Sequence, residues 1–191
     1  MKKHIITLSG YPGSGKSSTG NGLATKLGYT RFSSGDFMRS IAQERGISLE
    51  ELGAIAKTDH TIDDAVDAEV RKAGLQENLV IDSRLAYHWI PEAFKVFLTL
   101  NLHTAAERIY HHIQKEGRVG QDGSSIEEVY RETLARVESE RTRYTNIYGL
   151  SYDDPKNYDL VVDTGTHNLE EVIQIILDAY RVWDDAPSQT K

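Results

Sequence analysis

The sequence contains no cysteine among its 191 residues. Disulfide bridges and thiolate metal sites are therefore excluded, and the absence agrees with a cytoplasmic protein. No apolar run approaches the roughly 20 residues that a helix needs to cross a bilayer. The basic start at Lys2, Lys3 and His4 leads directly into an apolar segment. We therefore expect neither a signal peptide nor a membrane partner.

Positive charge is also scarce, because 22 Lys and Arg stand against 29 Asp and Glu, a net charge of −7. Proteins that bind long nucleic acids usually carry a basic face, so this balance argues against a nucleic-acid partner. The length suits one well-buried core with at most small appended lobes. We expect a single domain over residues 1–183, a monomer that binds small molecules, and a disordered tail at 184–191.

What the sequence does contain is a glycine-rich segment, Gly10–Ser17, with the spacing G-x-x-x-x-G-K-[ST] of a phosphate-binding P-loop. Glycines let the backbone curl around a polyanion and point its N–H groups inward. Lys16 would bring a positive charge to the outer phosphates, and the hydroxyl of Ser17 would bind Mg²⁺. The alternative is a glycine-rich turn without a ligand.

The context of this loop favours the phosphate site. An apolar segment at Ile5–Leu8 precedes it as a predicted strand, and a predicted helix over 16–27 follows and ends at Gly28. Free N–H groups and the helix dipole would both face the ligand. Arg108, on a later predicted helix, is a weaker candidate for contact with the base or the phosphates of ATP. The expected ATP-binding residues are Gly10, Tyr11, Pro12, Gly13, Ser14, Gly15, Lys16, Ser17, Ser18 and Arg108.

Strands and helices alternate along the chain. Strands are predicted near 5–8, 29–32, 78–82, 94–100 and 158–163, and helices end near residues 27, 44, 56, 74, 115, 148 and 183. Ser48, Thr61, Ser124 or Ser125, and Asn168 are the predicted caps of four of the helices. The alternation predicts an α/β fold, a three-layer α/β/α sandwich around a parallel five-stranded sheet. Three helices without a strand between them indicate a small lobe over about 33–75.

Polar residues follow the predicted strands, and in such sheets the ligand lies at the carboxyl ends of the strands. Asp82 ends the third strand, where a carboxylate can hold Mg²⁺ together with Ser17. The alternative is an Asx turn. Arg39 and Arg84 each follow a strand by a few residues. Their guanidinium groups could grip the phosphate of a second substrate bidentately, or form surface salt bridges instead.

A long predicted helix follows a glycine-rich segment at 117–123, and together they form a predicted lid over about 117–145. Arg136 and Arg143 are seven residues apart and lie on one face within about 20°, whereas Arg141 lies well off it. Two guanidinium groups there could stabilise a transferring phosphoryl group. The alternative is a solvated face with pairs such as Glu132 with Arg136. No general base is evident, and none is needed if the acceptor is a monophosphate oxygen.

The chain resembles the nucleoside monophosphate kinases, and most closely the short, archaeal-type cytidylate kinases. The motifs that carry the resemblance are Gly10–Ser18, Ser33–Arg39, Ile62-Asp63 with Val66-Asp67, Val80–Ala86, Arg136–Tyr144, Ile147–Gly149 and Tyr158–Thr164. The resemblance implies transfer of the γ-phosphoryl group of ATP, with Mg²⁺, to CMP or dCMP. It makes the segment 33–75 the lobe that binds the monophosphate. The residues expected there are Ser34, Gly35, Asp36, Arg39, Asp63, Asp67 and Arg84. The expected catalytic residues are Lys16, Arg39, Arg84, Arg136 and Arg143.

Two other functions stay open. The first is a kinase for a different acceptor, such as UMP, AMP or a shikimate-type substrate. The second is a P-loop switch or binding module that has no acceptor, which would leave the four arginines without a common purpose.

Overall fold

The computed structural model describes residues 2–116 and 125–187. Its strands are β1 (Ile5–Gly10), β2 (Thr30–Ser33), β3 (Leu79–Asp82), β4 (Phe94–Thr99) and β5 (Leu160–Asp163). Its helices are α1 (Lys16–Leu27), α2 (Ser34–Glu44), α3 (Leu49–Ile55), α4 (Thr61–Ala73), α5 (Ala86–Trp89), α6 (Leu102–Glu116), α7 (Ile126–Tyr148), the short 3₁₀ helix η1 (Pro155–Asn157) and α8 (Leu169–Asp185). The predicted elements are confirmed within a few residues, whereas α5 and η1 were not predicted.

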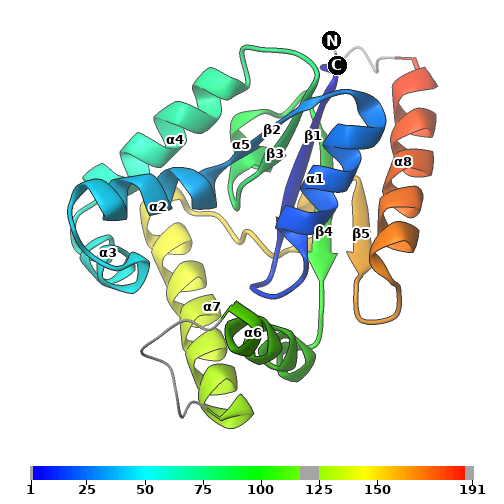
Figure 1. The fold of residues 1–191 in the computed structure, drawn as a ribbon. Helices are drawn as coiled ribbons and strands as arrows, with labels where there is room; N and C mark the ends of the chain where they lie inside the picture. The colour runs from blue at the N-terminus through cyan, green and yellow to red at the C-terminus, as the bar shows by residue number, and fades with distance from the viewer. Residues whose placement is uncertain (1, 117–124, 188–191) are drawn as a thin grey trace.

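In the described residues, one sheet of five parallel strands has the order β2-β3-β1-β4-β5. The predicted α/β fold is thereby confirmed. Leu8 pairs with Asp82, and Gly10 pairs with Leu98. All strands therefore end at the same edge of the sheet, toward α6 and α7 (Figure 1). The first strand lies in the middle, so the loop that follows it is flanked by the ends of β3 and β4.

Helices cover both faces of the sheet because successive side chains of its strands point to opposite faces and are apolar on both. Ile6, Leu8 and Val80 face α1 and α8, where they join the largest apolar cluster. Ile5 and Ile81 point the other way and pack against α4 and α5. The strand β1 is thus buried on both sides, which holds the glycine-rich loop that follows it on a rigid support.

The helices α2, α3 and α4 pack on one another beside the sheet, as Figure 1 shows. Ala42, Leu52, Ala56 and Ile62 form a separate apolar cluster between them. The cluster gives this helical lobe its own small core. The lobe is joined to the sheet by β2 and β3 and faces α7 across the end of the sheet.

The predicted helix caps are confirmed at three of four places. Ser48, Ser125 and Asn168 each accept a bond from the backbone N–H three residues on, in complete capping boxes. The cap predicted at Thr61 was wrong, because Thr61 is already the first residue of α4. The carboxylate of Asp59 accepts from the Thr61 backbone N–H at 3.0 Å and takes over the role of the cap.

The C-terminal helix is longer than predicted. It ends at Asp185 instead of Trp183, so the first two residues of the predicted tail are helical. Lys2 holds this end of α8 by donating to the carbonyl oxygen of Trp183, and His4 pairs with Asp184 at 3.5 Å.

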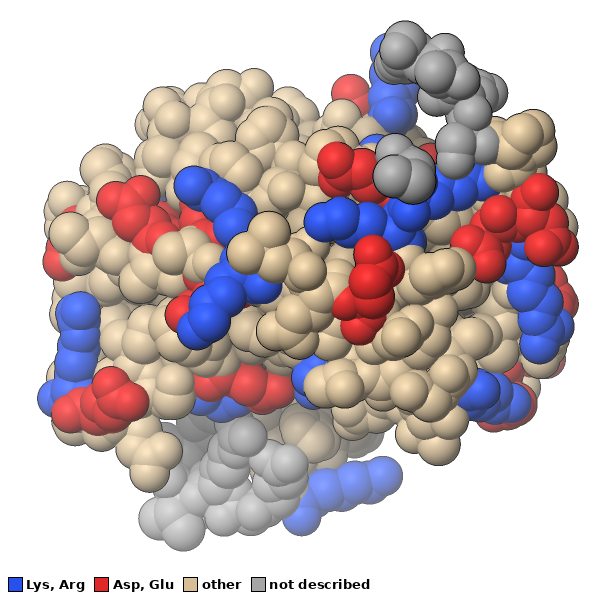
Figure 2. All heavy atoms as spheres, turned by 90° about the horizontal axis from the view of Figure 1, so that it is seen from above, with Lys and Arg blue, Asp and Glu red and all other residues tan. Residues whose placement is uncertain are grey.

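The face at the amino ends of the strands carries Lys and Arg interspersed with Asp and Glu (Figure 2). The rest of the predicted tail, 188–191, and the glycine-rich part of the predicted lid, 117–124, lie outside the described residues.

Candidate active site

The loop between β1 and α1 packs closely against two neighbouring elements. Gly10 has a φ of 147°, and a Cβ there would lie 2.3 Å from the carbonyl oxygen of Leu98 in β4. Gly13 has a φ of 73°, and its Cβ would lie 2.9 Å from the carbonyl oxygen of Ala105 in α6. Both positions require glycine, because a side chain would meet backbone and the second conformation is left-handed. The loop can therefore curl tightly before the first turn of α1.

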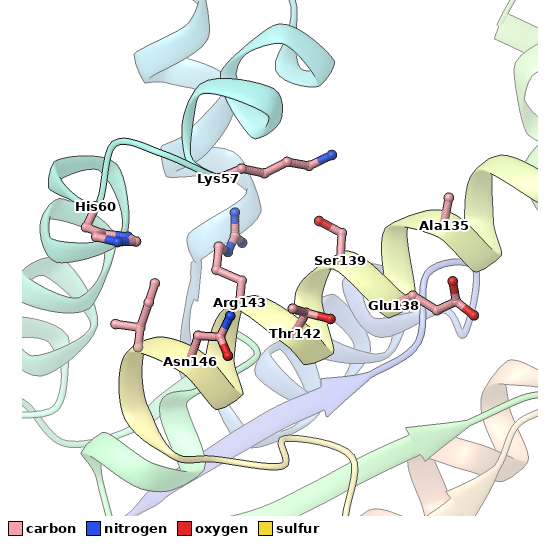
Figure 3. Close-up of a pocket in the computed structure, with 9 residues that line it drawn as sticks. Lys57, His60, Ala135, Glu138, Ser139, Thr142, Arg143 and Asn146 are labelled. Atoms are coloured by element: carbon pink, nitrogen blue, oxygen red, sulfur yellow. The ribbon is translucent and has the colours of Figure 1, made fainter.

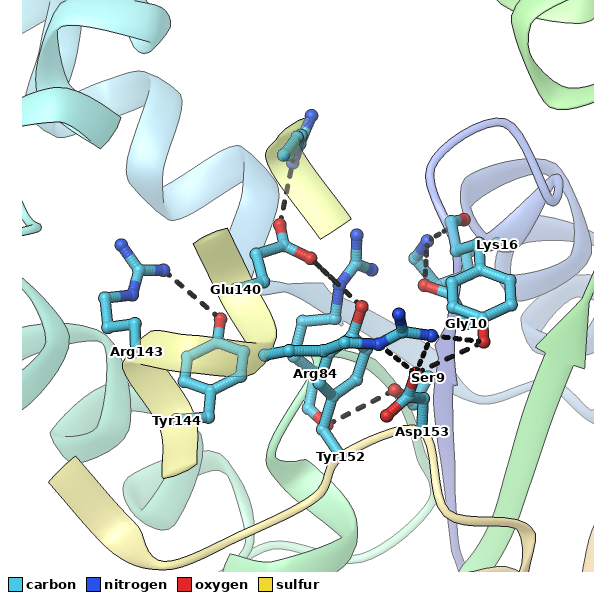
Figure 4. A network of polar contacts seen from close by, with 12 residues as sticks. Ser9, Gly10, Lys16, Arg84, Glu140, Arg143, Tyr144, Tyr152 and Asp153 are labelled. Atoms are coloured by element: carbon cyan, nitrogen blue, oxygen red, sulfur yellow. Dashed lines mark hydrogen bonds and ion pairs between the residues drawn. The ribbon is translucent and has the colours of Figure 1, made fainter. Parts of the chain in front are cut away.

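Lys16 folds back over this loop. Its Nζ donates to the carbonyl oxygens of Gly10 at 3.0 Å and Tyr11 at 2.9 Å, as Figure 4 shows. Burial, together with the nearby charge of Arg84, lowers the pKa of Lys16 to about 7. The charges of Asp82 and Glu140 offset this only in part, so a further anion beside the ammonium group would stabilise its charged form.

Ser17 and Asp82 come together as the sequence predicted for a metal-binding pair. The Ser17 hydroxyl lies 3.2 Å from Oδ2 of Asp82, and that oxygen also accepts from Nη2 of Arg31 at 2.9 Å. The two oxygens fit Mg²⁺, which takes few protein ligands and completes its shell with phosphates and water. No group of three or more His, Cys, Asp or Glu in the described ranges could hold a metal by itself.

The predicted arginines Arg84 and Arg136 meet at a carboxylate that sequence reasoning missed. Nε of Arg84 donates to Oε2 of Glu140 at 2.9 Å, and Nε of Arg136 donates to Oε1 at 3.1 Å (Figure 4). The side chains of Arg84 and Glu140 are only 12% and 10% exposed. Burial would raise the pKa of Glu140, but the two guanidinium groups outweigh it and hold that pKa at about 2.

Arg84 is therefore no surface salt bridge, and the pair of Arg136 with Glu132 that we considered is replaced by one with Glu140. A signal for Glu140 was present in the sequence, because it stands four residues after Arg136 and three before Arg143. Residues three and four apart are neighbours on a helix surface. The burial of that helix face could not be read from its mostly polar residues.

Arg143 lies in a different part of the site from Arg136. It lines a pocket of about 440 Å³ between α7 and the connection from α3 to α4, opposite Lys57 and His60 (Figure 3). Its Nε is 3.5 Å from Oδ2 of Asp63 in α4. Neither of these two buried atoms has a hydrogen-bond partner within the described part of the chain. Burial raises the pKa of Asp63 in spite of the arginine.

Asp67, one turn further along α4, has a different environment. Its carboxylate accepts from Nε1 of Trp89 at 3.0 Å and from the hydroxyl of Tyr148 at 2.6 Å. Both of its oxygens are thus bonded to α5 and α7. This residue ties the helical lobe to the rest of the fold, whereas Asp63 keeps an oxygen free toward Arg143.

The start of α2 holds the remaining residues predicted to bind the monophosphate. Arg39 is 55% exposed and pairs with Asp36, which also accepts from Nη1 of Arg31 at 3.1 Å. Burial raises the pKa of Asp36, but Arg39 and Arg31 lower it by more. Ser34 donates to the carbonyl oxygen of Asp82 at 3.3 Å, and a Cβ on Gly35 would lie 3.7 Å from Arg39.

Arg108 lies on the far side of the phosphate loop. It donates to the carbonyl oxygen of Thr164 at 2.7 Å. Together with Ser14 and Ser18 it lines a cleft of about 220 Å³ beside the start of α8. The two pockets have no lining residue in common.

Comparisons with known proteins agree with this geometry. Residues 5–166 match the sequence profile of the cytidylate kinase-like family. The chain belongs to the cytidylate kinase-like family. A cytidylate kinase of Methanothrix thermoacetophila is 37% identical over 93% of this chain and 98% of its own length. One of Haloarcula marismortui is 36% identical over 92% of this chain and 88% of its own.

Solved structures with low sequence identity to this chain show the same fold. Shikimate kinase from Bacteroides thetaiotaomicron superimposes with a TM-score of 0.65 at 17% identity, over 93% of this chain and 98% of its own. Shikimate kinase from Acinetobacter baumannii, solved with shikimate, gives a TM-score of 0.59 at 15% identity. At these identities the likeness concerns the fold.

Proposed function

We propose that this member of the cytidylate kinase-like family transfers the γ-phosphoryl group of ATP to CMP or dCMP, giving ADP and CDP or dCDP. The observation that carries the proposal is the meeting of Arg84 and Arg136 at Glu140, within reach of the charge on Lys16. These cations come from three separate elements. A cluster of fixed positive charge is what stabilises a phosphoryl group in transfer.

The chemistry needs no general base. An oxygen of the acceptor phosphate, already anionic near neutral pH, attacks the γ-phosphorus, and the bond from that phosphorus to the bridging oxygen of ADP breaks. Arg84 and Arg39 would hold the acceptor phosphate, while Arg136 and Lys16 neutralise charge on the transferring group. Glu140 would orient Arg84 and Arg136 in advance, which lowers the cost of ordering them.

Binding of the donor falls to the phosphate loop. Its backbone N–H groups would surround the phosphates, and the cleft beside Arg108 would take the adenosine. Ser17 and Asp82 are the residues that would hold Mg²⁺, which neutralises phosphate charge when bound. Arg31 shares an oxygen of Asp82. This contact keeps the carboxylate in place.

The pocket lined by Arg143 suits a pyrimidine base. Its volume of about 440 Å³ lies within the usual range for small-molecule sites. Cytosine presents an amino donor at N4 beside acceptors at N3 and O2. Arg143 lines the pocket and would donate to the acceptors. Asp63 pairs with Arg143 from behind the lining residues, and its carboxylate would turn toward the base to accept from the amino group. Uracil presents an acceptor in place of the amino group, so its O4 would face the Asp63 carboxylate.

The test is a coupled assay of ADP release with CMP, dCMP, UMP, AMP, shikimate and no acceptor. The largest stimulation is expected from CMP and dCMP. A chain that releases ADP at one slow rate whatever acceptor is added would be a switch or binding module. Faster turnover with shikimate than with any monophosphate would contradict the proposed acceptor class.

A further inference from the structure

Tyr11, the second residue of the phosphate loop, reaches across the site to helix α7. Its hydroxyl donates to Oδ2 of Asp153 at 3.2 Å and accepts from Nη2 of Arg141 at 3.3 Å. Nε of Arg141 donates to the same oxygen of Asp153 at 2.7 Å. The three side chains therefore form a closed triangle between the loop, α7 and the segment after α7. We call this group the Tyr11 triangle.

Two members of the triangle, Tyr11 and Asp153, are held in place by packing and burial. The Tyr11 ring packs edge-to-face on Phe97 of β4, with 5.4 Å between ring centroids. The side chain of Asp153 is only 13% exposed, and the neighbouring Tyr152 is fully buried. Burial and the charge of Asp153 raise the pKa of Tyr11, so its hydroxyl keeps the proton that it donates. The phosphate loop thus has a fixed connection to α7.

The position of Arg141 on α7 explains what the connection can do. Its neighbour Glu140 binds Arg84 at the end of β3, while Arg141 binds Tyr11 at the end of β1. Two consecutive residues thus join α7 to the ends of two strands. The carbonyl oxygen of Tyr11 also accepts from Nζ of Lys16 at 2.9 Å, so the residue that contacts α7 also contacts the catalytic lysine.

We infer that the Tyr11 triangle is a positioning device that sets the spacing between the phosphate loop and the arginines of α7. The inference rests on the proposed kinase function. The side chain of Tyr11 acts here through Lys16 and α7, whereas its backbone belongs to the loop that would bind the phosphates. An error of about 1 Å in such spacing costs much of the rate, although each substrate still binds.

The experiment compares Tyr11→Phe, Arg141→Gln and the double variant with the wild-type chain in steady-state kinetics. Tyr11→Phe keeps the ring that packs on Phe97, and Arg141 is half-exposed, so both variants should fold, which thermal unfolding checks. The matched control is Tyr29→Phe, which removes a hydroxyl bonded to Tyr180 at 3.1 Å, away from the site. It should leave the kinetics unchanged.

We expect kcat to fall about tenfold in each single variant, with both KM values within about twofold of wild type. The double variant should lose little more than the larger single loss, because the two residues act through one contact. Wild-type kcat in Tyr11→Phe would overturn the inference. A loss confined to a higher KM for ATP would also overturn it, because Arg141 and Tyr11 would then be donor-binding residues.

The wild-type chain is measured first across the acceptor panel. If CMP gives no stimulation, the proposed acceptor is wrong, and the variants are compared on whichever acceptor, water included, does give turnover. The split between kcat and KM tests the positioning role in either case. A failure of the inference is thereby distinguished from a failure of the proposed function.

Discussion

Oε2 of Glu140 lies 2.9 Å from Nε of Arg84, although 56 residues separate the two in the chain. The contact joins the end of β3 to the middle of α7. The other oxygen of Glu140 lies 3.1 Å from Nε of Arg136, so one carboxylate orients two of the arginines in the proposed phosphate grip. Its own charge repels phosphate, and its benefit must come from holding those guanidinium groups in place.

Replacing Glu140 with Gln should therefore slow transfer instead of accelerating it. The amide keeps the shape of the side chain, but its NH2 group cannot accept a bond from a guanidinium. One of the two bonds is therefore lost and the other loses its charge assistance, so we expect kcat to fall by about tenfold or more. The measurement is ADP release at saturating ATP and CMP. Glu132→Gln, an exposed change on the same helix, should leave the rate as it is. A faster Glu140→Gln enzyme would show that the carboxylate acts chiefly by repulsion.

Glu140 should also make the free energy of unfolding depend on pH. Its pKa is about 2 in the fold against an ordinary value of 4.5, so the stabilisation is complete above about pH 4.5 and is lost as pH falls toward 2. The free energy involved is on the order of 3 kcal/mol. Denaturant unfolding should show that wild type has a larger free energy of unfolding than Glu140→Gln near pH 6, and that this difference becomes smaller in acid. A constant difference would contradict the assignment.

Lys16 should take up a proton when ATP binds. Because burial lowers its pKa to about 7, Lys16 is largely neutral at pH 8 in the free chain, and the phosphates of ATP would restore its charge. Calorimetric titrations in buffers of different ionisation enthalpy should show uptake approaching about one proton, absent in Lys16→Ala. Equal proton exchange in the two chains would contradict this.

Lys16→Ala should in addition lower turnover by about a hundredfold or more, because it removes a positive charge that would stabilise the transferring phosphoryl group. The matched control is Lys26→Ala. Lys26 lies ten residues further along α1 and pairs with Glu170 at the surface, so its removal should leave turnover near the wild-type value.

Arg39 should act on the acceptor. Arg39→Ala is expected to remove most turnover and to raise the KM for CMP by about tenfold or more, with a small change in the KM for ATP. Arg45→Ala, an exposed arginine just after the same helix, is the control. A wild-type rate in Arg39→Ala would contradict its place in the grip, and its pairing with Asp36 would then be only a surface salt bridge.

Asp63 should decide which pyrimidine is preferred. Asp63→Asn gives the site a donor in place of a charged acceptor, so it can meet O4 of uracil. We expect the ratio of kcat/KM for CMP to that for UMP to fall by about tenfold. Asp64→Asn changes the exposed neighbour on α4 and should leave the ratio unaltered. An unchanged ratio in Asp63→Asn would remove Asp63 from base recognition.

Local patterns in the sequence were enough to predict the five strands and the longer helices, but not the short helices α5 and η1. The loop at Gly10–Ser17 could be predicted because the spacing of its glycines and Lys16 is a pattern within eight consecutive residues. Ser48 and Asn168 show helix starts because a cap and its partner lie three residues apart. Thr61 misled the same reasoning, since a cap two residues earlier, Asp59, was available to the same helix.

The amino-acid sequence by itself determined the α/β fold, the phosphate loop and the set of arginines. Only the tertiary structure decided that Arg84 meets Glu140 and that Tyr11 meets Arg141, which stand 56 and 130 residues apart in the chain. The physical reason is the separation along the chain over which each kind of interaction acts. Caps, turns and periodicity act over a few residues, whereas these pairs form only after the sheet has brought the ends of β1 and β3 against α7.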